Sequence, residues 1–273
     1  MRQRITVMTR LVKKSISAFA VAFAALSIVP LAQSNTANNI LIGNVYDSKT
    51  GVELYTEQHQ FLIKPESHTL QSRYFDQDDQ LIGERKVEYQ SNRVERYRLE
   101  QGHLGIAEEI ERTPEGLYFS VTKDGQTKTK EITYKNPNEI VIDAGFDDFI
   151  VREWKRLMQG KTIKFPYASA SQMDVVKLQI KRVDAKSQLL ADAQKARFEM
   201  TTSNPLFRLV ITPITIEYFT DTRELASYRG ISNIKDSNRN NFDAYVEFER
   251  DAAFRKLANR AKSPESKISV VAN

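Results

Sequence analysis

Hydrophobic alternation with a period of two runs through most of this chain, from about residue 40 to residue 250. Runs such as "TLQSRYFD", "LIGERKVEY" and "VERYRLEQ" are separated by short stretches that hold Gly, Pro, Asp or Asn. Leu117, Phe119 and Val121 share one face of such a run. This pattern predicts consecutive antiparallel strands joined by tight turns, in a sheet with one solvated face.

The number of predicted strands limits the shape of the sheet. Ten or more strands exceed what a flat sheet carries, so we expect the sheet to curl. The predicted fold class is mainly β, a strongly curved antiparallel sheet or half-open barrel with one helix packed in or across the concave face. The run "LFRLVITPITIEYF" is apolar on both faces, and Pro213 within it predicts a bulge or bend at a sheet edge, because proline donates no hydrogen bond.

One segment, "VIDAGFDDFIVREWKRLMQGKTIKF", predicts a helix that leads into a strand. Its apolar residues fall at helical spacing beside a charged face, and Gly160 lies where a C-terminal cap is expected. The helix carries the single tryptophan of the chain, which offers more bulk than a small strand residue. We expect the apolar stripe to face the concave sheet and to line any ligand site there; its residues are Phe149, Ile150, Trp154 and Leu157.

Three carboxylates gather at the start of this helix, at Asp143, Asp147 and Asp148. They have two interpretations, a hard-cation or acid–base site and a set of N-cap and first-turn acids that favour the helix dipole. The capping interpretation needs no metal and is the one we adopt. The sequence therefore predicts neither a metal site nor a cofactor.

The first 34 residues have the pattern of a secretory signal peptide. A basic head without acids precedes the apolar run "ISAFAVAFAALSIVPL" and the small residues Ala32 and Ser34. The run is about 16 residues long, shorter than the ~20 that a membrane-spanning helix needs, although an uncleaved anchor is the alternative. We expect cleavage, export to the periplasm, one β-rich domain over residues 35–250 and a helical or flexible tail over residues 251–273.

Charge and composition exclude several classes of function. The chain has 40 basic and 35 acidic residues, and five of the basic ones lie in the predicted leader, so the mature part is neutral. A neutral chain lacks the basic footprint of a nucleic-acid-binding protein. The absence of cysteine excludes thiol catalysis and cysteine-ligated metals. No hydrolase elbow, paired-histidine spacing or phosphate loop occurs, so we predict that the protein is not an enzyme.

The segment "YRGISNIKD" holds a second group of candidate residues. Polar side chains after a glycine can form a ligand site at a strand end, and Asn and Asp equally favour turns by bonding their own backbone. The turn is the preferred interpretation. If the segment does hold a polar binding determinant, the residues expected to form it are Tyr228, Arg229, Ser232 and Asn233, together with Asp143 and Asp147.

Three stretches, "GVELYTEQH", "DAGFDDFI" with "GKTIKF", and "PITIEYFTDTRELASYRGISNIKD", resemble a family of exported Gram-negative proteins without assigned function. The resemblance spans about residues 43–248. The expected architecture is also distantly similar to the half-barrels of periplasmic lipoprotein carriers. That likeness implies a concave face that binds an acyl chain or another apolar ligand, although fold alone does not define function.

Two functional hypotheses follow from these observations. The first is a periplasmic, non-catalytic binding or carrier protein for an apolar or amphiphilic, lipid-like envelope ligand. The alternative is a structural or interaction protein of the cell envelope with a filled core, no ligand and a protein partner. We expect a monomer in either case. The two hypotheses differ in whether the concave face is hollow.

Overall fold

The computed structural model describes residues 40–63, 67–90, 93–143, 145–183, 194–205 and 212–248. The predicted signal peptide and the predicted C-terminal tail lie outside these residues. Within the described ranges, no helix combines the length and the apolar character needed to cross a membrane.

All strands of the described ranges belong to one sheet, in the order β8-β7-β6-β5-β4-β3-β2-β1-β15-β14-β13-β12-β11-β10-β9. Neighbouring strands are antiparallel except β9 and β10, which are parallel. The strands are β1 (Ile40–Asp47), β2 (Glu53–Ile63), β3 (Ser67–Phe75), β4 (Leu81–Gln90), β5 (Arg93–Gln101), β6 (Ile106–Thr113), β7 (Gly116–Lys123), β8 (Gln126–Thr133), β9 (Val141–Ile142), β10 (Ile163–Ser169), β11 (Asp174–Arg182), β12 (Lys195–Thr202), β13 (Ile214–Phe219), β14 (Leu225–Lys235) and β15 (Asn241–Glu247).

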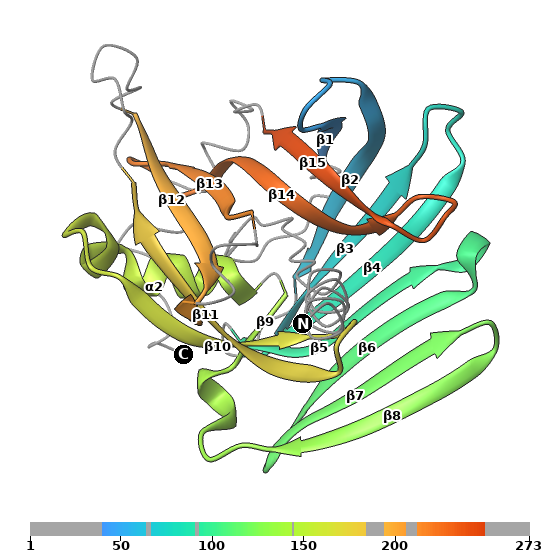
Figure 1. Cartoon of the computed structure of the whole chain (residues 1–273), viewed down its shortest axis with the longest axis horizontal. Coiled ribbons are helices and arrows are strands. Elements are labelled where there is room, and N and C mark those ends of the chain that lie inside the picture. Colours follow the sequence, from blue (N-terminus) through green and yellow to red (C-terminus); the bar gives the residue numbers. More distant parts are fainter. Residues whose placement is uncertain are drawn as a thin grey trace, which may run out of the picture.

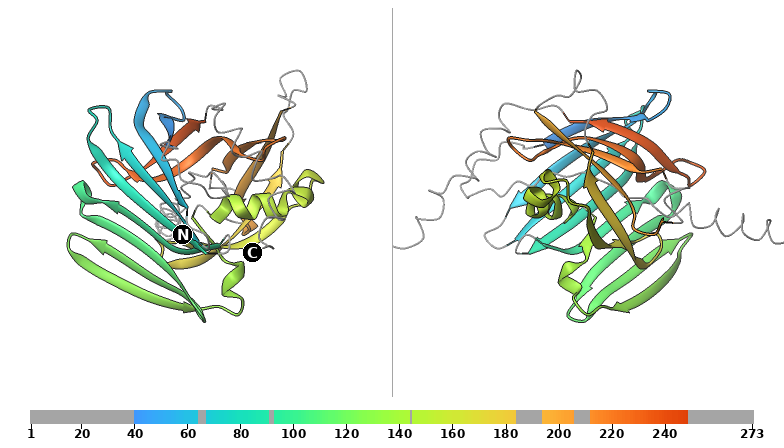
Figure 2. Two further views of the ribbon diagram at one scale, coloured as in Figure 1. Left: turned by 180° about the vertical axis from the view of Figure 1, so that it is seen from behind. Right: turned by 60° about the vertical axis from the view of Figure 1, so that its left-hand side comes forward.

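The sheet curls around its own concave face without closing, and β8 and β9 form its two edges (Figures 1 and 2). This confirms the predicted strongly curved antiparallel sheet. Short 3₁₀ helices, η1 (Gly102–Leu104) and η2 (Pro137–Glu139), lie in two of the connections.

The alternation of the sequence sets which side chains face the interior. In β3, Leu70, Ser72 and Tyr74 are buried, whereas Gln71 and Arg73 between them are exposed. Successive side chains of a strand point to opposite faces, so one face of β3 contributes to the core and the other meets solvent. The same pattern holds in β4 and β5.

Pro213 does not lie where we predicted. It directly precedes β13, and β13 pairs on both sides, with β12 and β14, so it is not an edge strand. Because Pro213 lies just before the first residue of the strand, its missing N–H removes no ladder hydrogen bond. The predicted bend at a sheet edge is therefore wrong.

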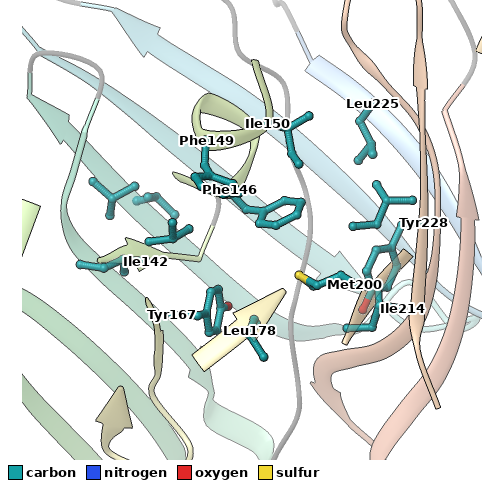
Figure 3. Close-up of a cluster of buried hydrophobic side chains, with 14 of the residues drawn as sticks. Ile142, Phe146, Phe149, Ile150, Tyr167, Leu178, Met200, Ile214, Leu225 and Tyr228 are labelled. Carbon is teal, nitrogen blue, oxygen red and sulfur yellow. The ribbon is translucent and has the colours of Figure 1, made fainter. Parts of the chain in front are cut away.

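The predicted helix is α2 (Gly145–Met158), and it leads into β10 as expected. Gly160 follows the helix with φ +77° and donates to the carbonyl of Leu157 at 2.9 Å, which confirms the expected C-terminal cap. The helix lies across the concave face and contacts both β5 and β11 (Figure 1). Side chains of α2 project toward strands that carry Met200 and Tyr228 (Figure 3).

The β7–β8 hairpin supplies a test of strand pairing. A Cβ atom added at Gly116 would lie 1.8 Å from the backbone carbonyl oxygen of Ile132, so Gly116→Ala must push the two strands apart. We expect a loss of about 1–3 kcal/mol or more in the free energy of unfolding, measured by urea denaturation.

Gly102→Ala is the matched control, since no atom lies within 4 Å of a Cβ at that position. Its stability should stay close to that of the wild type. Equal losses in the two variants would contradict the described β7–β8 pairing.

Candidate functional site

The structure brings the four predicted apolar site residues together on the inner face of α2. Phe149, Ile150, Trp154 and Leu157 are all buried. The Trp154 ring makes edge contacts with Phe198 of β12 at 5.6 Å and with Tyr218 of β13 at 6.2 Å between centroids. These residues form packed core rather than the wall of an open space.

The described region contains two small cavities and one open groove that bear on the predicted site. The two cavities have volumes of about 10 Å³ each, room for about one water molecule. The groove, about 440 Å³, lies at the rim formed by the starts and ends of β4–β7. None of the three is lined by Phe149, Ile150, Trp154 or Leu157.

The second predicted group is divided between different environments. Tyr228 and Ser232 line one small cavity, and Asn233 lines the other. Arg229 is exposed, lies 4.6 Å from the ring centroid of Tyr245 and donates to the carbonyl of Ser48. The four residues therefore do not converge on one site.

The segment that holds these residues is mostly strand, and the predicted turn is present only at its last residue, Asp236, whose carboxylate accepts a hydrogen bond from the backbone N–H of Asn240 at 2.8 Å. Ser232 and Asn233 lie within β14, and the turn to β15 spans residues 236–240. The pairing with β15 shifts between Ile231 and Lys235, and such a bulge bends a hairpin. The bent hairpin reaches across the concave side of the sheet (Figure 1).

Contacts at the hairpin show that it fills the interior beside β2–β6. The hydroxyls of Tyr55 and Ser232 are 2.7 Å apart, and the Asn233 side chain donates to the Tyr97 hydroxyl at 3.4 Å. Lys235 is buried, with its ammonium 3.6 Å from the Glu108 carboxylate. The polar residues of this segment thus contact polar side chains of β2, β5 and β6 inside the fold.

A row of buried polar residues on β2, β3 and β4 was not predicted from the sequence. His59 Nε2 lies 3.2 Å from Glu57 Oε1, and His59 Nδ1 lies 2.8 Å from the Ser72 hydroxyl. Arg85 donates to the same hydroxyl at 3.0 Å and lies 3.2 Å from an Asp143 oxygen. All five residues are buried, so this row joins three strands to the start of α2.

A sequence signal for this row exists. Glu57 and His59 have the same parity as Tyr55 in β2, and Arg85 has the same parity as Val87 in β4. Tyr55 and Val87 are core residues, so the polar residues two positions away must face the core as well. Glu57, His59 and Arg85 can therefore be recognised in the sequence as polar residues at strand positions where the alternation otherwise places apolar ones.

The order serine, histidine and acid resembles the arrangement that activates a nucleophilic serine. Here Ser72 is 1 % exposed, and its hydroxyl also accepts a hydrogen bond from Arg85. The cavity that Glu57 lines has room for about one water. A substrate carbonyl has no route to this serine, so the arrangement gives no support to acyl transfer.

The three aspartates do not act together as predicted caps. Asp147 and Asp148 do lie in the first turn of α2, as expected, but the helix begins at Gly145, so neither is the N-cap residue. Asp143, with φ +40°, precedes the helix and pairs with Arg85. Asp147 accepts a hydrogen bond from the Tyr218 hydroxyl, and burial raises the pKa of its carboxyl to about 8.

The histidines and acids give no metal centre within the described ranges, where no group of three or more metal-ligating side chains converges. His59 belongs to the buried row, His68 stacks on Tyr89 at 4.3 Å between centroids, and His103 lines the rim groove. The residues capable of holding an ion are therefore occupied with one another or dispersed.

The fold and its interior define a class, a β-barrel-like protein whose unclosed sheet is filled by a helix and a hairpin. No family model matches the chain, and no curated protein matches it. The chain is similar to a solved structure from Brucella abortus, a beta-barrel-like protein of domain of unknown function DUF1849. The two share 10 % identity, with 77 % of this chain and 95 % of the other covered and a TM-score of 0.38. A likeness of this size carries no functional argument.

The buried Arg85–Asp143 pair yields a prediction. Arg85→Met should cost about 3–5 kcal/mol of unfolding free energy, because Asp143 then stays buried without its arginine. The double variant Arg85→Met/Asp143→Asn should regain part of that loss, since the second change removes the buried charge. Urea denaturation of the variants measures both effects.

Arg73→Met on neighbouring β3 is the matched control. Arg73 pairs with Glu84 at 3.3 Å on the solvated face, with 64 % and 50 % of the two side chains exposed. An exposed pair contributes at most about 1 kcal/mol. A loss as large as that of Arg85→Met would refute the assignment of Arg85 as a buried structural charge.

Proposed function

We propose that this protein is a structural or interaction protein of the cell envelope that acts through its surface. The observation that supports the proposal is the filled concave face. The two small cavities, of about 10 Å³ each, are far smaller than the ~300 Å³ at which small-molecule pockets begin. Neither is lined by the inner face of α2, so neither offers an acyl chain room beside the helix.

Displacement of α2 does not provide that space at an accessible energy. The helix buries five apolar side chains, Phe146, Phe149, Ile150, Trp154 and Leu157. Exposing a buried side chain of this kind costs about 1.5–3 kcal/mol, so exposing all five costs on the order of 10 kcal/mol. This sum approaches the whole stability of a typical domain, about 5–15 kcal/mol. The energy therefore opposes a full displacement of α2 that would expose all five side chains and admit an acyl chain.

The outer face supports a protein partner over an anionic polymer. Arginines on this face pair with glutamates across strands, as with Arg98 and Glu109 at 2.8 Å and Arg96 and Glu109 at 3.0 Å. The positive charges of these arginines are thus balanced locally, which disfavours binding of an anionic lipid or polysaccharide at this part of the face. Ile42 and Leu62 are exposed aliphatic side chains on the adjacent strands β1 and β2.

The carrier hypothesis keeps one supporting observation, the rim groove. Its volume of about 440 Å³ lies within the range of ligand pockets. Leu81 and Ile106 line it beside Glu84, Glu100 and His103, a mixed lining suited to a small amphiphile. Such a site differs from the predicted one at Trp154. Native mass spectrometry of the protein isolated from the periplasm tests the carrier hypothesis, and detection of a co-purified lipid would favour a carrier.

Trp154 separates the two functions. If the core is filled, Trp154→Ala should cost about 3–5 kcal/mol of unfolding free energy, the usual loss for a buried aromatic ring. The fluorescence of wild-type Trp154 should also stay constant on titration with a fatty acid. Trp154→Phe, which keeps an aromatic ring in place, should lose much less. A blue shift on titration, together with a small loss in Trp154→Ala, would establish the carrier.

Export remains part of the proposal. The basic head and the short apolar run should direct cleavage near Ala32–Ser34 and release the protein to the periplasm. N-terminal sequencing of the periplasmic protein is expected to begin near residue 35. Recovery of a chain with intact Met1 in the membrane fraction would exclude cleavage and favour the uncleaved anchor.

A further inference from the structure

Asp147 has an unusual environment for a carboxylate. It lies in the first turn of α2, is 4 % exposed and faces β13. Its Oδ1 atom accepts a hydrogen bond from the Tyr218 hydroxyl, and its Oδ2 atom is buried without a hydrogen-bond partner among the described groups. A buried carboxylate normally has several donors or a cation, because an unpaired buried charge is costly.

The charged groups around Asp147 do not supply that compensation. Asp143 and Asp148 lie on the same stretch of chain and are negative. Arg85 of β4 is the facing cation, and it lies against Asp143 at 3.2 Å. Tyr218 of β13 and Tyr89 of β4 are the other titratable groups that interact with it, and both can only become negative.

We propose that Asp147 is protonated while α2 is docked, and that its ionisation loosens α2 from β12 and β13. The carboxyl is thus a pH-sensitive latch between helix and sheet. The proton goes to solvent as the pH rises, and the anion that remains requires water, which enters only if the helix shifts away from Tyr218.

The electrostatics agree with this geometry. Burial raises the pKa of the Asp147 carboxyl from 3.8 to about 8, while the hydrogen bond from Tyr218 lowers it by a smaller amount. The N-terminal end of a helix also favours the anion, yet its effect is small beside full burial. Between about pH 4 and pH 8 the folded protein therefore holds a proton on Asp147 that the unfolded chain has lost. The stabilisation of the fold by this proton is fully present below about pH 4 and is lost as the pH rises to about 8.

The chain contains its own reporter for this change. Trp154 is the single tryptophan, and its ring lies 6.2 Å from the ring of Tyr218. Loosening of α2 would expose the indole to water and move its emission to longer wavelength. Every fluorescence change can therefore be assigned to this helix.

The experiment is a titration from pH 5 to pH 9.5 of the full chain, with Trp154 emission and urea denaturation measured at each step. In the wild type the folding equilibrium constant should fall by up to about tenfold per pH unit below pH 8, and the emission should shift to the red near pH 8. Asp147→Asn, which cannot ionise, should show a shallower slope and a constant emission.

Asp148→Asn is the matched control, because Asp148 lies in the same turn but is only half-buried. It should keep the wild-type slope. The proposal is overturned if Asp147→Asn retains that slope, or if Asp148→Asn removes it. Carbon-13 NMR of the aspartate carboxyls in the wild type gives a test that does not depend on any variant folding, and a titration of Asp147 near pH 4 would equally refute the proposal.

Discussion

A curved sheet that does not close must cover its own concave face, and the rest of this structure depends on that constraint. In the described part of the chain, every strand except the edge strand β8 buries apolar residues on the inner side, and water contact with that side would remove the main stabilisation of the fold. Two elements from the second half of the chain provide the cover. The helix α2 lies across β10–β13, and the bent tip of the β14–β15 hairpin enters the space beside β2–β6.

The buried polar groups give this cover a definite position. Apolar packing alone tolerates sliding, whereas a buried charge is stable in few places, because each shift leaves it unpaired. Arg85 fixes the start of α2 through Asp143, and Lys235 fixes the hairpin through Glu108. The row from Glu57 to Asp143 and the Lys235 cluster therefore set the register of the two inserted elements relative to the sheet.

The parts of the fold that depend on local patterns could be predicted from the sequence. Alternation gave the strands, helical spacing gave the stripe around Trp154, and Gly160 marked the helix end. The place of Pro213 was predicted wrongly, because a proline suits an edge strand, a bulge and the residue before a strand alike, and the local pattern does not separate these. The Arg85–Asp143 contact was hidden for another reason: the two residues lie far apart in the chain, and nothing in either segment names its partner.

The sites were harder to predict than the fold, because a ligand site depends on unfilled space. The stripe around Trp154 was correctly assigned to the concave side, and the sequence could not tell that Phe198 and Tyr218 occupy the space opposite Trp154. Likewise, the polar pattern of Ser232 and Asn233 suits a ligand or an internal partner equally well. The structure shows internal partners, because the hydroxyl of Tyr55 contacts Ser232 and the hydroxyl of Tyr97 contacts Asn233.

The edge strand β8 carries features that oppose pairing of the sheet with a second copy of the chain. β8 is an eight-residue edge strand, and all but one of its residues are exposed. Suppose that β8 paired antiparallel with β8 of a second copy, about a two-fold axis perpendicular to the sheet. The inner faces of the two sheets would then lie on the same side. Even-numbered residues would lie opposite even-numbered ones, and odd-numbered residues opposite odd-numbered ones. Registers centred on residue 128, 129 or 130 each place Lys128 or Lys130 opposite a lysine, and like charges in that position are destabilising. The edge thus disfavours extension of the sheet, and a partner protein that used it would need acidic residues at alternate positions.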